Sequence, residues 1–315
     1  MSTAGILISE VGPRDGLQSV KNTMPTEAKK RWIRALADAG IREIEVGSFV
    51  PPTLLPQLAD AGEIVAFTRS IPGVTVAALI PNLKGAENAV RAGAQKITFP
   101  FSCSPTHSLK NLRVTHEQAF EQVAAIIALL RSLPNDQKPH FEVSLSTAFG
   151  CTIEGEVPEA TVLSIAERAM ALGADEVGLA DTSGYANPAQ VRTMVKSLRR
   201  VVGDAAVTGI HIHNTRGLGL ANVLAALDVG ITTFDSSHGG LGGCPFAPGA
   251  SGNIVTEDLC FMLNAMGLDT GVNVEALITA REMLKAGLPD EPLYGFVPDA
   301  GLPLNYRGLS GRNGG

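Results

Sequence analysis

Two histidines, His211 and His213, are separated by one residue near the end of an apolar run that covers residues 207–214. The run alternates as a β-strand does, and side chains two positions apart on a strand project from the same face. The pair therefore offers two imidazole nitrogens to one point, which suits a divalent metal ion. The alternative is a chance pair on a half-buried strand, and the spacing by itself does not decide between them.

A second polar motif, VGPRDGLQ, covers residues 11–18 and follows an apolar run at residues 6–11. Asp15 offers a carboxylate oxygen that could join the two histidines on a metal ion. Arg14 offers a rigid cationic fork for an oxyanion or a carboxylate. The alternative is an ordinary Pro-Arg-Asp-Gly turn with a solvated salt bridge, which is the commoner fate of such a string taken alone.

A glycine-rich segment, HGGLGGCPFAPGASGN, covers residues 238–253. A loop with so much glycine has little reason to be ordered unless something binds it. Cys244 at its centre lies on no apolar helix face, which indicates a functional thiol acting as a proton donor or a nucleophile. A flexible surface loop with an incidental cysteine is the alternative. Asn253, just before an expected helix, could cap that helix or reach the metal.

The elements that must position these residues alternate between short β-like runs and longer helical patterns. Thr26 and Thr115 are expected to cap two of the helices, and glycine ends several of them. Strands are expected at residues 6–11, 44–49, 74–80, 96–101, 141–146, 176–181, 208–213 and 233–236. Helices are expected at residues 27–39, 83–92, 116–130, 159–172, 189–202, 218–229 and 256–266.

Eight successive strand–helix units predict an α/β fold in which a parallel sheet closes into a (β/α)8 TIM barrel. An open, doubly wound sheet is the alternative, but no GxGxxG follows the first strand. Residues 1–271 are predicted to form the catalytic barrel. Residues 272–315 are expected to form an extension of helix and loop that packs on or near the barrel, with a partly mobile tail at 305–315.

In such a barrel the carboxyl ends of all strands face one mouth, where active sites of this fold lie. Glu45 on the second strand and Asp181 at the end of the sixth are expected there with Asp15 and the histidine pair. Lys21, Lys110 and Asn111 fall in loops where they could meet the phosphates of a nucleotide-bearing substrate. Solvated loop residues are the usual alternative.

The composition limits the partners of the chain. Its 315 residues carry a net charge of −6 and no basic stripe, which makes nucleic acid an unexpected partner. The longest apolar run, at residues 123–130, is too short to span a bilayer, and the first residues do not resemble a signal peptide. Four cysteines without CxxC spacing favour a reduced, cytoplasmic location.

Five motifs follow one another over about residues 10–272. They are EVGPRDGLQ, IEVGSFV, PNLKG, HxH and GGLGGCP…GASGN…TED. Taken in order, they resemble the 3-hydroxy-3-methylglutaryl-CoA lyase family of the DRE-TIM metallolyase superfamily. The resemblance implies a divalent metal, Mg²⁺ or Mn²⁺ before Zn²⁺. Its implied ligands are Asp15, His211 and His213, with Asn253 as a further or nearby ligand. Arg14 would stabilise an enolate oxygen. Glu45, Asp181 and Glu257 would orient the ligands, and Cys244 would sit on a mobile loop that closes over substrate.

The implied reaction is a retro-Claisen cleavage of a 3-hydroxyacyl-CoA to acetyl-CoA and a keto acid. A base, His211 or a water that it positions, would take the hydroxyl proton, and Cys244 or a metal-bound group would protonate the enolate. Lys21, Lys110 and Asn111 would meet CoA. The expected partner is a small-molecule acyl-CoA, with no membrane and no nucleic acid, and the expected assembly is a homodimer.

Three departures from the family pattern leave the acyl group open. Asn214 stands where aspartate is typical, Ser144 stands where the animal enzymes have tyrosine, and the C-terminal tail differs. Citramalyl-CoA or a longer branched hydroxyglutaryl-CoA is therefore an alternative substrate. A Claisen-condensing synthase of the same superfamily is a rival, although such enzymes lack the cysteine loop. The other rival is a non-catalytic CoA-binding protein.

Overall fold

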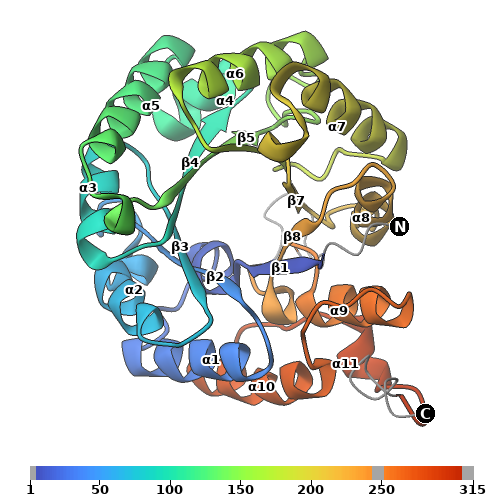
Figure 1. Cartoon of the computed structure of the whole chain (residues 1–315). Coiled ribbons are helices and arrows are strands. Elements are labelled where there is room, and N and C mark those ends of the chain that lie inside the picture. The colour runs from blue at the N-terminus through green and yellow to red at the C-terminus, as the bar shows by residue number, and fades with distance from the viewer. Residues whose placement is uncertain (1–4, 243–251, 307–315) are drawn as a thin grey trace.

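Eight parallel strands form a closed barrel in the computed structural model, which describes residues 5–242 and 252–306 (Figure 1). Each strand pairs with the next along the chain, and the last strand pairs with the first. The predicted (β/α)8 fold is therefore confirmed. The strands are β1 Leu7–Glu10, β2 Glu43–Ser48, β3 Thr75–Leu79, β4 Lys96–Ser102, β5 His140–Ser146, β6 Glu176–Asp181, β7 Gly209–Ile212 and β8 Thr233–Ser236.

Helices surround the barrel and link successive strands. The longer ones are α1 Thr26–Asp38, α2 Ala61–Arg69, α3 Leu83–Ala92, α5 His116–Arg131, α6 Glu159–Leu172, α7 Pro188–Val202, α8 Gly219–Leu227, α9 Thr256–Ala265 and α10 Val274–Gly287. The short ones are α4 Pro105–His107 and α11 Phe296–Ala300, with single turns η1 Gly12–Gly16, η2 Pro56–Leu58, η3 Ser108–Leu112, η4 Asn135–Gln137, η5 Asp204–Ala206 and η6 His238–Gly240.

The starts of two helices show where local sequence signals succeed and fail. Thr115 caps α5 in a capping box with Gln118, as expected. The expected cap at Thr26 is wrong, because Thr26 is the first residue of α1 and its hydroxyl donates to Asp60 at 2.7 Å. Asp60 precedes α2 without capping it. The sequence prediction missed α2, although Asp60 before it is a residue type that often caps a helix.

The inside of the barrel is polar and hollow. On β5 the outward side chains Phe141, Val143 and Leu145 are fully buried against the helices, whereas Glu142 and Ser144 point inward. Barrels of this type usually fill their interior with layers of branched apolar side chains. Here a cavity of about 400 Å³ is lined by residues from the mouth of the barrel and from the starts of several strands.

Charged side chains close the floor of this cavity at the amino ends of the strands. The ammonium of Lys96 lies 2.8 Å from Glu142, 3.5 Å from Glu43 and 3.8 Å from Glu176. A side chain at position 178 would collide with the Glu142 carboxylate, so Gly178 leaves the space that this carboxylate uses. We name Glu43, Lys96, Glu142 and Glu176 the floor cluster.

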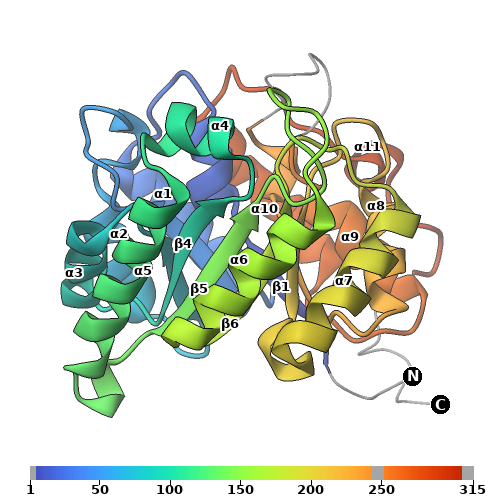
Figure 2. The ribbon, with the colours of Figure 1, turned by 90° about the horizontal axis from the view of Figure 1, so that it is seen from above.

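The chain after the barrel packs on its outer face. Helix α10 lies against α1, and α11 lies against α9 (Figure 1). At the opposite side of the ring, the arrows of β4 and β5 point toward the end of the barrel that carries α4, which is the mouth (Figure 2). Within the two described ranges, no helix is both long and apolar enough to cross a membrane. The expected tail falls largely at residues 307–315, outside the described residues.

Candidate active site

Three side chains that could bind a metal ion meet at the mouth of the barrel. Asp15 lies in η1, a turn in which the carbonyl of Val11 accepts the amides of residues 14–16. His211 lies on β7, and His213 follows that strand directly. One ligand atom from each of the three lies within 4.8 Å of the others. The structure thus brings together residues that are almost 200 positions apart in the chain.

Asp235 orients His211. It lies on β8 opposite His211 in the strand register, and its carboxylate is 3.0 Å from Nδ1 of the imidazole. A proton on Nδ1 that donates to Asp235 leaves Nε2 with a free lone pair, and Nε2 is 4.0 Å from Asp15. Burial lowers the pKa of His211, but the hydrogen bond to Asp235 and the charges of Asp235 and Asp15 together outweigh it, and the net shift is upward. Sequence reasoning missed Asp235, although it is an inward position of an expected strand.

Two buried polar atoms beside Asp15 point to a cation. Asn253 donates its amide to Asp15 at 2.7 Å and pairs through its backbone with His213. Its carbonyl oxygen and Nδ1 of His213 are buried without a hydrogen-bond partner among the described residues. Burial and the neighbouring His211 lower the pKa of His213 to about 4, so its imidazole is neutral at pH 7. Buried lone pairs that lack donors fit a divalent metal ion.

Arg14 carries the positive charge of the site. Its Nε donates to Glu45 at 2.5 Å and its terminal nitrogen donates to Asp15 at 2.5 Å. Burial would raise the pKa of Asp15, but Arg14, His211 and His213 together hold that pKa well below its usual range. Glu45 therefore acts on Arg14 rather than on the histidines, and it fixes the direction of the guanidinium at the cavity wall.

The two remaining carboxylates expected to orient the ligands, Asp181 and Glu257, make hydrogen bonds to other groups. Asp181 accepts the backbone amides of Tyr185 and Ala186 at 2.8 and 3.2 Å, and burial raises its pKa to about 6. It shapes the loop after β6. The carboxylate of Glu257 accepts the amide of Gly239 and pairs with Arg281 in a separate buried cluster, and its role in orienting the ligands stays a prediction.

The residues expected at the CoA end are divided between cavity and surface. Asn111 lines the cavity, while Lys21 and Lys110 are exposed and are not among the described lining residues. Leu54, Leu55 and Leu112 line the same side of the mouth. Cys244 lies outside the described residues, and so nothing here places its thiol.

Two of the three departures from the family pattern, Ser144 and Asn214, have different positions. Ser144 lines the cavity from β5. The side chain of Asn214 accepts the amide of Gly219 at 3.0 Å, at the start of α8, so it serves the helix rather than the histidine pair. Ser144 is therefore the departure that a substrate could sense.

Comparison with known proteins agrees with the site. The HMGL-like family model matches residues 5–284, most of the chain. The chain belongs to the HMGL-like family. The hydroxymethylglutaryl-CoA lyase YngG of Bacillus subtilis (strain 168) is 42% identical over 289 residues, which cover 90% of this chain and 94% of the relative. The human mitochondrial hydroxymethylglutaryl-CoA lyase is 39% identical over 275 residues, covering 87% and 83%.

Solved structures of this HMGL-like family share the whole fold. An HMG-CoA lyase from Acinetobacter baumannii, in complex with coenzyme A and 3-methylmalate, superposes with a TM-score of 0.89 at 40% identity and covers 98% of both chains. The HMG-CoA lyase of Bacillus subtilis gives a TM-score of 0.88 at 38% identity and covers 94% of this chain and 97% of its own.

Proposed function

We propose that this protein is a metal-dependent carbon–carbon lyase that cleaves 3-hydroxy-3-methylglutaryl-CoA to acetyl-CoA and acetoacetate. The observation that carries the proposal is the meeting of Asp15, His211 and His213 beside Arg14 in a polar cavity. Relatives named as HMG-CoA lyases, at about 40% identity over most of the chain, support the same reaction. No rival explains both the site and the relatives.

The metal ligands in this proposal are Asp15, His211 and His213, with the carbonyl oxygen of Asn253 as a fourth. A carboxylate, two imidazoles and a carbonyl suit Mg²⁺ or Mn²⁺, and Zn²⁺ is the alternative. A bound divalent cation supplies Lewis acidity that lowers the pKa of the tertiary hydroxyl of the substrate. Asp235 supports the set, since a histidine ligand usually donates its other ring proton to a carboxylate.

The proposed reaction makes use of the position of Arg14 at the cavity wall. The substrate hydroxyl gives its proton to a water beside His211, because both ring nitrogens of His211 are engaged in this proposal, and the bond between the acetyl unit and the hydroxyl carbon breaks. The hydroxyl carbon becomes the ketone of acetoacetate, and the electron pair stays with the acetyl-CoA enolate. The guanidinium of Arg14, held by Glu45, stabilises the enolate oxygen. Cys244 is our assigned proton donor to the enolate carbon.

The substrate class rests on the neighbouring structures. The Acinetobacter enzyme was solved with coenzyme A and 3-methylmalate, a hydroxy diacid. We therefore expect an acyl-CoA whose acyl group carries a hydroxyl and a distal carboxylate. Asn111 at the cavity, with Lys21 and Lys110 on the surface, is our assignment for the CoA end. Citramalyl-CoA and longer branched hydroxyglutaryl-CoA remain alternative substrates. For location and assembly, we propose that the protein is cytoplasmic and forms a homodimer.

A thioester panel tests the proposal. The purified protein is incubated with Mg²⁺ or Mn²⁺ and with 3-hydroxy-3-methylglutaryl-CoA, citramalyl-CoA or a longer branched analogue, and acetyl-CoA and keto acid are measured. We expect cleavage that chelation abolishes and that added metal restores. Absence of cleavage across the panel contradicts the lyase assignment. Net condensation of acetyl-CoA with a keto acid, without the reverse reaction, favours the synthase.

A further inference from the structure

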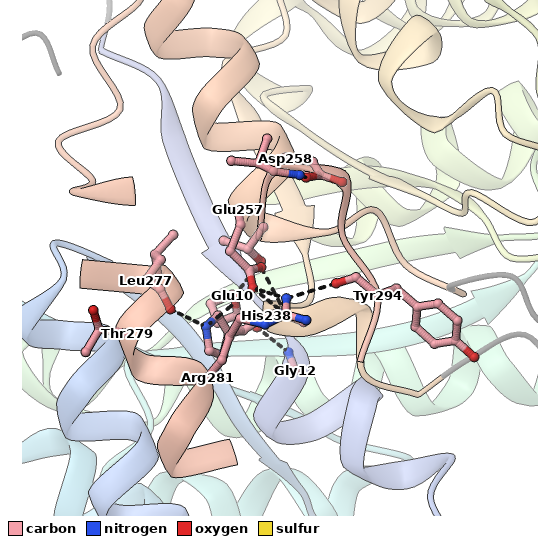
Figure 3. Close-up of polar contacts among 12 residues, drawn as sticks. Glu10, Gly12, His238, Glu257, Asp258, Leu277, Thr279, Arg281 and Tyr294 are labelled. Carbon is pink, nitrogen blue, oxygen red and sulfur yellow. Dashed lines mark hydrogen bonds and ion pairs between the residues drawn. The ribbon is translucent and has the colours of Figure 1, made fainter. Parts of the chain in front are cut away.

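A second buried polar cluster lies next to the candidate site and has no part in the proposed reaction (Figure 3). It contains Glu10 at the end of β1, His238 in η6 and Glu257 on α9, and all three are fully buried. Burying two carboxylates in one cluster is costly unless each accepts several hydrogen bonds. The contacts of the cluster therefore indicate what it holds in place.

His238 in this cluster is locked in one neutral form. Its Nδ1 is 3.1 Å from the indole nitrogen of Trp32, which can only donate, so Nδ1 is the acceptor. Its Nε2 is 2.8 Å from the carbonyl oxygen of Leu277, which can only accept, so Nε2 carries the proton. The imidazole thus anchors the turn after β8 to α1 through Trp32 and to α10 through Leu277, and Figure 3 shows the second of these contacts.

Glu10 accepts hydrogen bonds from three separate segments of the chain. One carboxylate oxygen accepts the amides of Gly12 and His238, each at 2.8 Å. The other accepts the hydroxyl of Thr256 at 2.6 Å. A Cβ at position 12 would lie 2.6 Å from the Glu10 oxygen, so glycine is needed for this close approach. The Glu10 carboxylate thus bonds at once to the turn after β1, to the turn after β8 and to the start of α9.

Each of the three residues that donate to Glu10 lies three positions along the chain from a residue of the candidate site. Gly12 precedes Asp15 by three positions in η1, and His238 follows Asp235 by three positions after β8. Thr256 follows Asn253 by three positions at the start of α9. The three site residues are also in one chain of contacts, since Asn253 bonds Asp15 and Asp235 bonds the His211 ring that faces Asp15.

We propose that Glu10 is a positioning residue that sets the relative placement of Asp15, Asp235 and Asn253, and hence the affinity of the site for its metal. The inference rests on the proposed metal site. It adds to that site a residue that touches neither metal ligand nor substrate. Glu10 acts on the site through hydrogen bonds from two backbone amides and one hydroxyl. The shape of its side chain therefore matters more for metal affinity than its charge.

Glutamine at position 10 offers a matched test of shape against charge. The amide oxygen of Gln can accept the amides of Gly12 and His238, as the carboxylate oxygen does. Its amide nitrogen can donate to the Thr256 hydroxyl, which is free to donate in turn to Ser236 at 2.8 Å. Burial also raises the pKa of Glu10 to about 8, so the native contacts accommodate an uncharged carboxyl near neutral pH. Alanine removes all three contacts.

The experiment measures Mn²⁺ binding by titration calorimetry without substrate, together with kcat and KM for 3-hydroxy-3-methylglutaryl-CoA. We expect Glu10→Ala to weaken Mn²⁺ binding by about tenfold or more, the lower end of what outer-shell changes cost. The variant should lower kcat at subsaturating metal more than it raises KM. Glu10→Gln should stay within about threefold of the wild type in Mn²⁺ affinity. Leu198→Ala, in the buried face of α7, is the stability control, with a lower Tm and unchanged Mn²⁺ affinity.

The outcomes separate the inference from the function on which it rests. A wild type that binds no Mn²⁺ overturns the metal site and the role of Glu10 together. A wild type that binds Mn²⁺ and a Glu10→Ala variant that binds it equally well overturn the role of Glu10 alone. If Glu10→Ala does not fold, Thr256→Val removes only the hydroxyl contact, and a several-fold weaker Mn²⁺ affinity than in Thr256→Ser supports the inference. Equal affinities of the two Thr256 variants overturn it.

Discussion

The two ends of the barrel cavity carry charged clusters of opposite design. At the floor, Lys96 supplies the cation, and Glu43, Glu142 and Glu176 surround it. At the mouth, Asp15, His211 and His213 converge with no ammonium among them, and buried lone pairs of His213 and Asn253 lack donors within the described part of the chain. The floor has a cation of the chain itself at its centre. The mouth already holds Arg14, paired with Asp15 and Glu45, and its buried lone pairs can accept a further cation from outside. One buried oxygen of Glu43 at the floor also lacks a hydrogen bond among the described residues, but Lys96 lies 3.5 Å from it, so the two ends differ in whether a cation is already in place.

The largest expected effect comes from removing a ligand at the mouth. His213→Ala should abolish retention of the metal and, with it, lyase activity, because the two remaining ligands of the triad hold a divalent ion poorly. Elemental analysis of the purified variant after dialysis measures the metal content. His140→Ala, at the floor and half-exposed, is the matched histidine control and should keep the metal. Unchanged metal content in His213→Ala would refute the assignment of this ligand.

The next effect concerns the charge at the mouth. Arg14→Met should lower kcat by about 10²–10³-fold, the scale of losing one donor to a developing oxyanion, with KM changed far less. Steady-state kinetics at saturating Mn²⁺ separate the two parameters. Because Glu45 loses its partner in this variant, Arg14→Lys is the companion that restores charge without the guanidinium fork. Full activity of Arg14→Met would remove this residue from the mechanism.

A smaller effect is expected from the carboxylate that orients a ligand. Asp235→Asn should weaken Mn²⁺ binding by about 10–100-fold, because an amide holds the His211 ring and its tautomer less firmly than a carboxylate does. Calorimetry without substrate measures this affinity. Glu176→Gln, whose carboxylate contacts His140 at the floor, is the control that should bind Mn²⁺ normally. Equal affinities of the two variants would show that Asp235 does not support the site.

Breaking the floor cluster should affect folding rather than metal binding. Lys96→Met leaves three buried glutamates without their cation, and the free energy of unfolding should fall by about 3–5 kcal/mol, as for other broken buried ion pairs. Denaturant unfolding gives this value, and elemental analysis gives the metal content. Retained metal in a destabilised variant supports the contrast between the two ends. Loss of the metal with unchanged stability would reverse the roles of floor and mouth.

The smallest effect is a pH dependence that originates at the floor. Burial raises the pKa of Glu142 to about 7, partly offset by Lys96, with Glu176 and Asp235 adding to the rise. The unfolded carboxyl titrates near its ordinary value of about 4.3, so this contribution to stability is complete below that pH and is lost as the pH rises through 7. Glu142→Gln should therefore show a smaller fall in Tm between pH 5 and pH 8, by about 2–5 °C. Thermal scans of both proteins measure the difference, and parallel curves would contradict it.

Prediction from sequence worked best where the signal was local. The strands β6 and β8 and the helices α3 and α6 begin and end at the predicted residues, because alternation, prolines and terminal glycines are read within a few positions. Helix α2 was missed although Asp60 stands at its start, and in the structure this carboxylate binds Thr26 and Lys29 of α1 instead of the helix amides. The helix exists because the chain must cross from β2 to β3.

The site was predicted in part for the same reason. The pair His211 and His213 is a local spacing, and Asp15 could be added because the ends of parallel strands share one edge. Asp235 and the separate cluster of Glu257 were not foreseen, because both depend on contacts between distant segments. Asn214, which looked like a change in the site, instead accepts the amide of Gly219.

The sequence by itself determined the order of the strands, the barrel and the histidine pair, because these follow from periodicity and from the geometry of neighbouring residues. Only the tertiary structure decided which carboxylate orients His211, which two atoms at the mouth lack donors, and what Glu10 holds. The contact of Glu10 with Thr256 joins residues 246 positions apart. Such contacts depend on the register with which β8 closes on β1, and no local pattern encodes that register.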